Sequence, residues 1–344
     1  MKINTVTGSL KKEELGVVSP HEHIFIDISA FFEERKLRDI ENPSTEKVKM
    51  EHLGQLNRDP YALKDNLKMT DYETQKKELL YFKKAGGNTV VDATMTGIGR
   101  DPLKLKRISE ETGINVIMGT GFYVSSTHPE ALKDMSDEEV SELMCKEINE
   151  GIDGVKAGVI GEIGISELFN AMERKVLRAS AIAHKKTGVG VLVHINPWTE
   201  NGREATDILI SNGVKPDRIA ISHIDVENRE DYIMYLLEKG VYIEFDNFGK
   251  EYYVEKEARR EGYGCFVNDM ERVKLLKKLI SKGYLNRILL SCDVCLKTLL
   301  RTYGGWGYDH LLTNVVPMML EEGITQEEID TMLIKNPANF LLGE

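Results

Sequence analysis

Short apolar runs recur along the chain, and amphipathic stretches with a helical period separate them. The runs are rich in Val, Ile and Leu, and they span residues 87–94, 115–119, 157–163, 189–194, 218–223, 241–246 and 287–293. A further run begins at Val17, so we predict eight strands of this kind. Because the runs are nearly continuous in apolar residues, they are typical of parallel strands covered on both faces.

The stretches between the runs carry signals for helix starts and stops. We predict helices over residues 101–112, 136–149, 173–186, 206–212, 229–239 and 269–282, and two final helices over 309–322 and 325–334. Asp101 with Pro102 is typical of an N-cap and a first helical position, and Gly113 and Gly188 end their helices. Eight strands alternating with helices predict an α/β fold, a (β/α)8 TIM barrel. No linker rich in Gly, Ser or Pro divides residues 1–344, so we interpret them as a single domain.

Two segments lie outside this alternation. Residues 1–6 predict a short additional strand at the start of the chain. Residues 33–68 form a long polar loop without a clear period, which follows the first barrel strand. Because such barrels carry their active sites on the face reached at that point, we interpret the segment as a lid or an interface loop. The alternative is a surface excursion with no role.

Polar residues stand at the ends of several predicted strands. His21 and His23 end the first strand, and alternate side chains of a strand share a face, so the two imidazoles lie side by side while Glu22 points away. Later strand ends supply the remaining members of the set, Glu162, His194, His223 and Asp293. Because the carboxyl ends of barrel strands converge on one mouth, we expect these six side chains to meet.

Four imidazoles and two carboxylates, without a thiolate, suit Zn²⁺, Mn²⁺, Co²⁺ or Fe²⁺. Six ligands exceed the four or so that one such ion takes, so we predict two divalent ions, with zinc as the first choice, that share a bridging ligand. A lone strand-end histidine is more often structural, but four on the right strands are hard to explain that way. We interpret the remaining histidines as structural: His52, His128, His184 and His310.

Composition narrows the partners. The chain has 344 residues, and 45 Lys and Arg against 56 Asp and Glu give a net charge of −11 with no basic block, which argues against nucleic acid. No apolar run is long enough to span a membrane and no signal peptide opens the chain, so we expect a cytoplasmic protein with a small-molecule substrate. A homodimer is left open. With only four cysteines, we interpret Cys292 and Cys295 as packed free thiols instead of a zinc knuckle.

Several motifs occur in an order and spacing that are specific when taken together. They are Leu15-Gly16 with His21-Glu22-His23, Gly99-Arg100-Asp101-Pro102, Gly119-Thr120-Gly121-Phe122-Tyr123, Lys156-Ala157-Gly158-Val159-Ile160-Gly161-Glu162, His194, Ser222-His223, Ser291-Cys292-Asp293 and Asn336-Pro337-Ala338-Asn339. Over nearly its full length the chain resembles the phosphotriesterase-related branch of the amidohydrolase superfamily. The resemblance implies a (β/α)8 barrel with a binuclear metal centre.

The resemblance also implies how the ligands are shared. His21, His23 and Asp293 would hold one ion, and His194 and His223 the other. Many relatives bridge the two ions with a carboxylated lysine on strand four, but this chain has Gly161 there, followed by Glu162. It is similar in this respect to a subgroup that uses the glutamate as the bridge. Lys156, near the start of the same strand, is then given a structural role.

The expected reaction is metal-dependent hydrolysis by a metal-bridging hydroxide, with Asp293 as the catalytic proton shuttle. We expect a lactone or carboxylic ester as substrate, because Tyr123 and the segment after Asp293 resemble lactonase-type relatives. We predict that four residues contact the substrate: Tyr123, Lys250, Lys297 and Arg301. The alternatives are that Tyr123 packs at the barrel rim and that the three cations are solvated surface residues. A phosphotriesterase, a phosphorylated sugar lactone hydrolase and a mononuclear deaminase remain alternative activities. The phospholactone is disfavoured because Leu296 and Lys297 stand where such relatives carry arginine.

Overall fold

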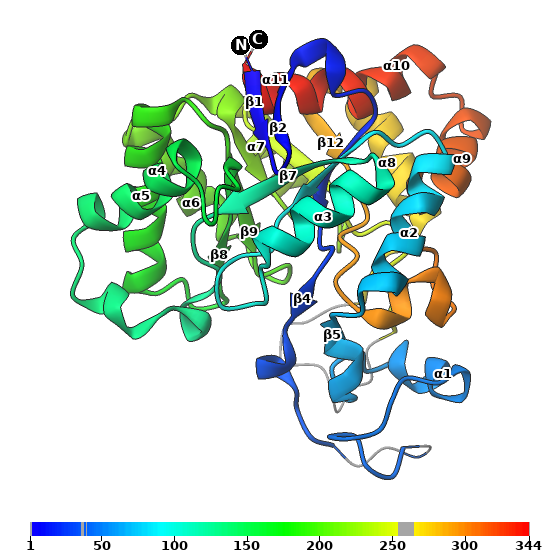
Figure 1. Ribbon diagram of the computed structural model, residues 1–344. Coiled ribbons are helices and arrows are strands. Elements are labelled where there is room, and N and C mark those ends of the chain that lie inside the picture. The colour runs from blue at the N-terminus through cyan, green and yellow to red at the C-terminus, as the bar shows by residue number, and fades with distance from the viewer. Residues whose placement is uncertain (1, 36–37, 39, 254–264, 344) are drawn as a thin grey trace.

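Eight parallel strands form the centre of the computed structural model, which describes residues 2–35, 38, 40–253 and 265–343 (Figure 1). In the order of pairing they are β12 (Ile288–Leu290), β11 (Tyr242–Phe245), β10 (Ile219–Ile221), β9 (Val191–Ile195), β8 (Ala157–Ile165), β7 (Asn115–Thr120), β6 (Thr89–Asp92) and β3 (Val18–Glu22). The two outer strands of this order, β3 and β12, contact each other, so the sheet curves into a nearly closed barrel. The predicted (β/α)8 barrel is confirmed.

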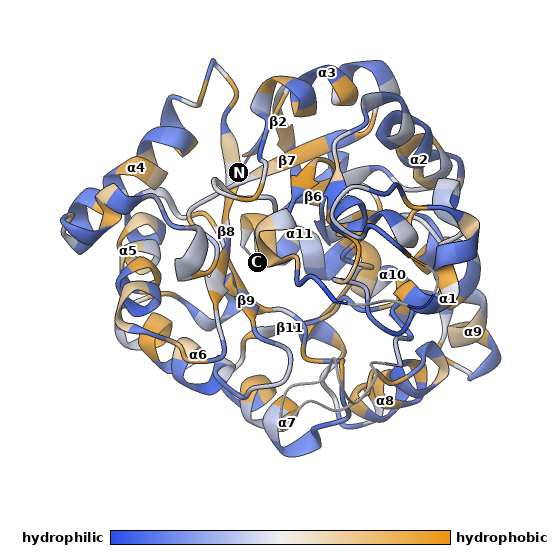
Figure 2. Cartoon of the chain, turned by 90° about the horizontal axis from the view of Figure 1, so that it is seen from below, coloured by the Kyte–Doolittle hydropathy of each residue, from blue (hydrophilic) through white to orange (hydrophobic). Residues whose placement is uncertain are grey.

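Helices surround the strands as an outer ring, with apolar residues turned inward (Figure 2). They are α2 (Tyr72–Lys84), α3 (Pro102–Thr112), α4 (Asp137–Asn149), α5 (Ala171–Thr187), α6 (Gly202–Ser211), α7 (Glu230–Glu238) and α8 (Asp269–Ser281), followed by α9 (Val316–Glu321), α10 (Gln326–Asp330) and α11 (Asn336–Leu342). π-Helical turns at Leu311–Val315 and Thr331–Lys335 precede α9 and α11. Asp101 caps α3 by accepting from the Lys104 amide, and Gly113 ends it at φ 67°.

Helix α2 is an element that the sequence analysis did not assign. Asp71 caps it by accepting a hydrogen bond from the Thr74 amide. Its buried face includes Gln75 and Glu78 beside Leu79 and Phe82, so the apolar period that reveals the other helices is weak here. Glu78 is fully buried and accepts from the backbone of Arg301 and Thr302, which explains a charged residue on an inward face.

The additional strand predicted over residues 1–6 forms, but it lies outside the barrel. β1 (Lys2–Thr5) pairs with β2 (Gly8–Lys11) in an antiparallel hairpin, while Met1 lies outside the described residues. The Asn4 side-chain amide donates to Ala157 O, and Val6 N donates to Val116 O. Since these residues lie at or near the amino ends of β8 and β7, the hairpin covers the end of the barrel opposite the strand-end ligands.

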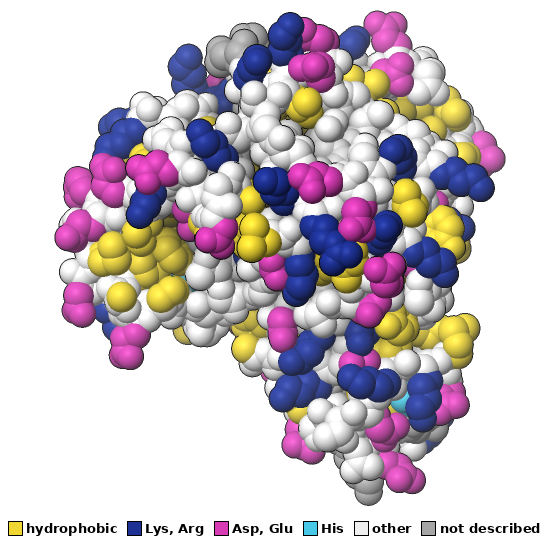
Figure 3. Space-filling model, in the orientation of Figure 1, with side chains coloured by type: hydrophobic (Ala, Val, Ile, Leu, Met, Phe, Trp, Pro, Cys, Tyr) yellow, Lys and Arg dark blue, Asp and Glu magenta, His cyan; other side chains and the backbone are white. Residues whose placement is uncertain are grey.

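The long loop after the first barrel strand is a folded excursion that projects from the barrel (Figures 1 and 3). It begins and ends at the antiparallel pair β4 (Ile26–Asp27) and β5 (Lys68–Met69), contains the short helix α1 (Leu53–Leu56), and packs a small apolar cluster of Ile40, Val48, Leu56 and Leu63. Within the predicted 33–68 segment, residues 36, 37 and 39 lie outside the described residues. Asn57 O accepts from Tyr253 N, so the excursion contacts the segment that follows β11.

Candidate metal centre

Six side chains from five strand ends converge at the carboxyl mouth of the barrel. They are His21 in β3, His23 just beyond it, Glu162 in β8, His194 in β9, His223 after β10 and Asp293 after β12. All six residues are buried or nearly so. The strands run parallel with their carboxyl ends on one side, so residues far apart in sequence meet here, as expected.

Glu162 lies between two sets of ligands. Its Oε1 is 3.3 Å from His23 Nε2, while its Oε2 is 3.4 Å from His21 Nε2 and 3.2 Å from His194 Nδ1. His223 Nε2 is 3.8 Å from the same Oε2. Asp293 Oδ1 lies 3.1 Å from His23 Nε2 and completes the first set. The Glu162 carboxylate is therefore near imidazoles of both groups: Oε2 lies between His21 and the His194–His223 pair, and Oε1 faces His23.

Hydrogen bonds on the far side of three imidazoles fix their orientation. His21 Nδ1 is 3.0 Å from Glu244 Oε2, His23 Nδ1 is 2.9 Å from Thr94 Oγ1, and His223 Nδ1 is 3.0 Å from Asp246 Oδ1. Each Nε2 is thereby turned toward Glu162. Histidine ligands of metals are held in this way, with the other ring nitrogen on a carboxylate or hydroxyl.

The supporting carboxylates Glu244 and Asp246 are residues that the sequence analysis missed. They stand two apart on β11 and just after it, so they share a face, and both are fully buried. The signal was present in the sequence: two acidic residues in an otherwise apolar predicted strand need partners, because an unpaired buried charge is costly.

The electrostatics of the site favour added positive charge. Burial lowers the pKa of the His23 and His223 imidazoles, but neighbouring carboxylates raise it. Asp293 and Glu162 raise the His23 pKa to about 9. Asp246 and Glu162 raise the His223 pKa to about 10. Burial likewise raises the pKa of Glu162, yet the surrounding imidazoles, His21 foremost, hold it well below its ordinary value. Clustered carboxylates thus draw protons onto buried histidines, and a divalent cation would supply the same charge.

The donor set fits metal ions. His21 Nε2 and Glu162 Oε2 are buried and have no hydrogen-bond partner among the described residues, although buried polar atoms are normally paired. Two groups of ligand atoms lie within 4.8 Å of one another, His21 with His23 and Asp293, and His21 with Glu162 and His223. Nitrogen and oxygen donors at this spacing are those that zinc and its neighbours take.

Two of the ligands sit on strained backbone. His223 has φ 61° and Asp293 has φ 45°, in the left-handed region that residues with a Cβ seldom adopt. Asp246 accepts from the His223 amide, and Glu22 accepts from the amides on both sides of Asp293, those of Cys292 and Val294. Glu22, whose side chain points away from His21 and His23, therefore stabilises the turn at Asp293. Strain maintained by such contacts is common at functional sites.

Two of the predicted substrate contacts lie at the centre. Tyr123 Oη is 3.2 Å from His194 Nε2, and the ring packs edge-on against the His194 ring. Lys250 is buried and its Nζ bonds to Asp293 Oδ2. Burial opposes the positive charge of Lys250, but Asp293 raises its pKa well above the ordinary value, so this cation is charged and already paired.

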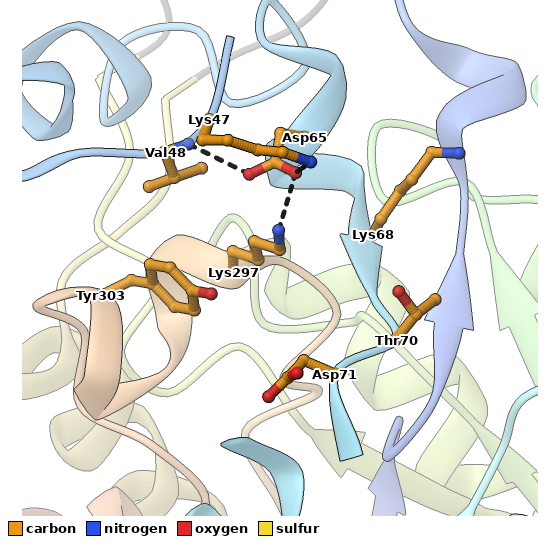
Figure 4. Close-up of a pocket in the computed structure, with 8 residues that line it drawn as sticks. All are labelled: Lys47, Val48, Asp65, Lys68, Thr70, Asp71, Lys297 and Tyr303. Atoms are coloured by element: carbon orange, nitrogen blue, oxygen red, sulfur yellow. Dashed lines mark hydrogen bonds and ion pairs between the residues drawn. The ribbon is translucent and has the colours of Figure 1, made fainter. Parts of the chain in front are cut away.

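The other two predicted substrate contacts are paired elsewhere. Lys297 Nζ lies 2.8 Å from Asp65 in a cavity of about 560 Å³ under the excursion, lined also by Lys47, Lys68 and Tyr303 (Figure 4). None of the six candidate ligands lines this cavity. Arg301 bonds to Asp309 and stacks on the Tyr81 ring. A substrate role for these two residues stays a prediction.

The remaining histidines and cysteines lie away from the ligand set, with one exception. Among the other histidines, His128 bonds to Tyr123 O, His184 to Val189 O and His310 to Asp269, while His52 is buried near Glu46 and Glu51. Among the described residues no cysteine forms a disulfide, and Cys295 Sγ lies 3.9 Å from Asp293 Oδ2, at the edge of the centre. Lys156 is exposed and precedes β8, away from Glu162. In the part of the chain that the structure covers, no helix combines the length and apolar character needed to cross a membrane.

Comparison with known proteins agrees with this geometry. The sequence model of the phosphotriesterase family matches residues 1–341. An N-acetyltaurine hydrolase from Danio rerio is 37% identical over 99% of this chain and 97% of its own length. The crystal structure of a resiniferatoxin-binding protein from Rhodobacter sphaeroides superposes with a TM-score of 0.94 at 31% identity, covering 99% of this chain and 94% of that one.

A second solved structure is similar at the same level of sequence identity. The phosphotriesterase homology protein from Escherichia coli, complexed with phosphate in its active site, has a TM-score of 0.78 at 30% identity and covers 95% of this chain and 99% of its own. The family match, the full-length relatives and the shared barrel agree with one another. The chain belongs to the phosphotriesterase family and is a hydrolase.

Proposed function

We propose that the protein is a metal-dependent hydrolase that cleaves a carboxylic acyl bond in a small substrate with two divalent ions. The observation that carries the proposal is the position of Glu162, whose carboxylate lies within 3.4 Å of imidazoles of both expected groups, those of His21 and His23 and that of His194. His21, His23 and Asp293 would hold one ion, His194 and His223 the other, and Glu162 would be shared. Zinc is the first choice, because the ligands are imidazole and carboxylate.

The residues of the chain then have distinct tasks. Bound ions of this kind lower the pKa of water and polarise a carbonyl oxygen. Asp293 accepts a proton at its carboxylate and returns it to the leaving group. Burial raises the Asp293 pKa, but Lys250 and the neighbouring imidazoles lower it below its ordinary value, so the carboxylate is ionised and can accept a proton. Tyr123 borders the site beside His194 and orients the substrate.

The leading substrate class is the N-acyl amide of a small anionic amine, of which N-acetyltaurine is the first example to test. This choice rests on N-acetyltaurine hydrolases that match 35–37% of residues over 97% of their own length. Amides, lactones and esters all react at a carboxyl carbon, so the same centre serves each of them. A lactone or simple ester is the second candidate, supported by the phenol of Tyr123 beside the ligands.

The competing activities differ in metal content and electrophile. A mononuclear deaminase needs one ion, which would leave one group of imidazoles around Glu162 without a purpose. A phosphotriesterase could use the same centre, so it differs from the proposed activity in the electrophile, which is phosphorus instead of a carboxyl carbon. These differences define the test.

The experiment measures metal content and kcat/KM on protein loaded with zinc, manganese or cobalt. The panel contains N-acetyltaurine, N-acetyl-β-alanine, γ- and δ-lactones, phenyl acetate and aryl dialkyl phosphates. We expect two ions per chain and the highest kcat/KM with an N-acyl amide, followed by lactones or esters. One ion per chain, or faster turnover of a phosphate triester than of every acyl substrate, would contradict the proposal.

A further inference from the structure

Tyr252 carries a buried hydroxyl that the structure leaves unused. It follows β11, two residues beyond Lys250, and only 6% of it is exposed. Its Oη has no hydrogen-bond partner among the described residues. A buried hydroxyl without a partner costs free energy, and native proteins rarely retain one without a reason. A ligand that enters the site would provide the missing acceptor.

The fold does not need this hydroxyl to position the ring. The Tyr252 ring packs edge-on against Phe266, with ring centroids 5.3 Å apart and planes at 88°. Phe266 packs in the same way against Trp198, at 5.5 Å and 88°. Edge-to-face packing of this kind orients an aromatic ring through its apolar surface. Phenylalanine at position 252 would keep these contacts, so the phenol oxygen is the part that awaits an explanation.

Tyr252 follows Lys250 by two residues, so it belongs to the segment that borders Asp293. The charges of Lys250 and Asp293 act on the Tyr252 phenol, and Asp293 acts on the Tyr123 phenol as well. Lys250 and Cys295 in turn contact the Asp293 carboxylate. The Asp293 carboxylate therefore acts on both phenols, with Tyr123 in contact with His194 and Tyr252 two residues beyond Lys250. Burial raises the Tyr252 pKa, so the hydroxyl keeps its proton and acts as a donor.

We propose that Tyr252 is a substrate-binding residue, which donates a hydrogen bond to an oxyanion at the amine end of the acyl substrate. The inference rests on the proposed acyl hydrolase function and narrows it to substrates with a carboxylate or sulfonate beyond the scissile bond. A neutral donor binds an anionic acceptor more strongly than a neutral one. The ammonium of Lys250, two residues away, keeps this side of the site from repelling an anion.

The test is Tyr252→Phe in the metal-loaded enzyme, measured on substrates with and without the oxyanion. N-acetyltaurine and N-acetyl-β-alanine carry it, while phenyl acetate has the same acyl group and no charge. We expect kcat/KM for the two anionic substrates to fall about 10-fold or more, mostly through KM, because hydrogen bonds to charged groups are worth this much. Turnover of phenyl acetate should change little, and the melting temperature should stay the same or rise.

Tyr232→Phe is the matched control. Tyr232 is also a buried tyrosine with an unpartnered hydroxyl, but it lies on α7 against Arg203 and Arg229. Its replacement should leave KM unchanged for every substrate. If Tyr252→Phe leaves KM for the anionic amides unchanged, or lowers kcat/KM for phenyl acetate equally, the inference is wrong.

A binding measurement separates this inference from the proposed function. Taurine and β-alanine carry the oxyanion and need no hydrolysis, so their affinity for the metal-loaded protein is measured by calorimetry. Weaker binding to Tyr252→Phe than to the wild type, with Tyr232→Phe unchanged, supports the inference even if no acyl substrate turns over. Equal affinity for the wild type and Tyr252→Phe, or no binding to either, overturns it.

Discussion

Glu22 offers a sharp test of how the barrel holds its catalytic end. The residue is fully buried, and its carboxylate accepts from Cys292 N at 3.0 Å and Val294 N at 2.8 Å. These two amides flank Asp293, and they belong to the segment after β12, whereas Glu22 ends β3. The carboxylate thus joins the first and last strands of the barrel and secures the turn that presents a candidate ligand. We predict that Glu22→Ala destabilises the protein and weakens metal binding.

The size of the effect follows from the groups left unpaired. Two buried amides lose their acceptor, and each such loss costs about 1–3 kcal/mol, so the sum is about 2–6 kcal/mol. The low end is expected, because burial raises the Glu22 pKa to about 7 and removing the carboxyl relieves that cost. A protein of ordinary stability, about 5–15 kcal/mol, would remain folded with this loss.

The assay is guanidinium unfolding of the metal-free protein, followed by metal content after dialysis against a weak chelator. Ser19→Ala is the matched control, since it removes one hydrogen bond to Glu22, of 2.8 Å, and leaves both amides paired. It should cost about 1 kcal/mol and retain the metal. A Glu22→Ala protein within about 1 kcal/mol of the wild type, with full metal content, would refute the reasoning.

Three further predictions concern the centre and its surroundings. Glu162→Gln should reduce bound metal to one ion per chain or fewer, as measured by elemental analysis. The control is Glu173→Gln, at a buried carboxylate that accepts from Ser125, Ser166 and Asn170, and it should retain both ions. Asp293→Asn should keep the fold, because asparagine tolerates its φ of 45°, and should lower kcat by about 10²-fold or more, which steady-state kinetics at equal metal content checks. Burial raises the Asp269 pKa, but His310, Gly249 N and Arg272 lower it below its ordinary 3.8. The ionised carboxylate therefore stabilises the fold above pH 3.8, and this stabilisation is lost as the pH falls through the pKa of the native state. Asp269→Asn should therefore lower the unfolding midpoint at pH ~7, and the difference from the wild type should shrink as the pH falls below 3.8. A difference that does not change with pH would contradict this.

The sequence alone determined the eight barrel strands, the helices between them from α3 to α8, and the identity of the metal-ligand candidates. Apolar runs report which segments are buried on both faces, and helix caps such as Asp101 and Gly113 act locally, so both can be recognised without a structure. The ligands followed because parallel barrel strands bring their carboxyl ends together whatever the connecting loops do. His21, Glu162 and Asp293 therefore meet as expected although their positions span most of the chain.

Only the tertiary structure decided which charged residues face the centre. Lys250 pairs with Asp293, whereas Lys297 pairs with Asp65 of the excursion. The next residue, Thr298, donates its amide to Asn66, 232 positions earlier in the chain. The sequence gives no periodic signal for such pairs, because they depend on how irregular loops fold over the barrel. The same holds for Glu244, whose role is set by the His21 ring across the barrel. Local patterns record burial and backbone preference, but contacts between loops are fixed only when the barrel closes and brings distant segments within hydrogen-bonding distance.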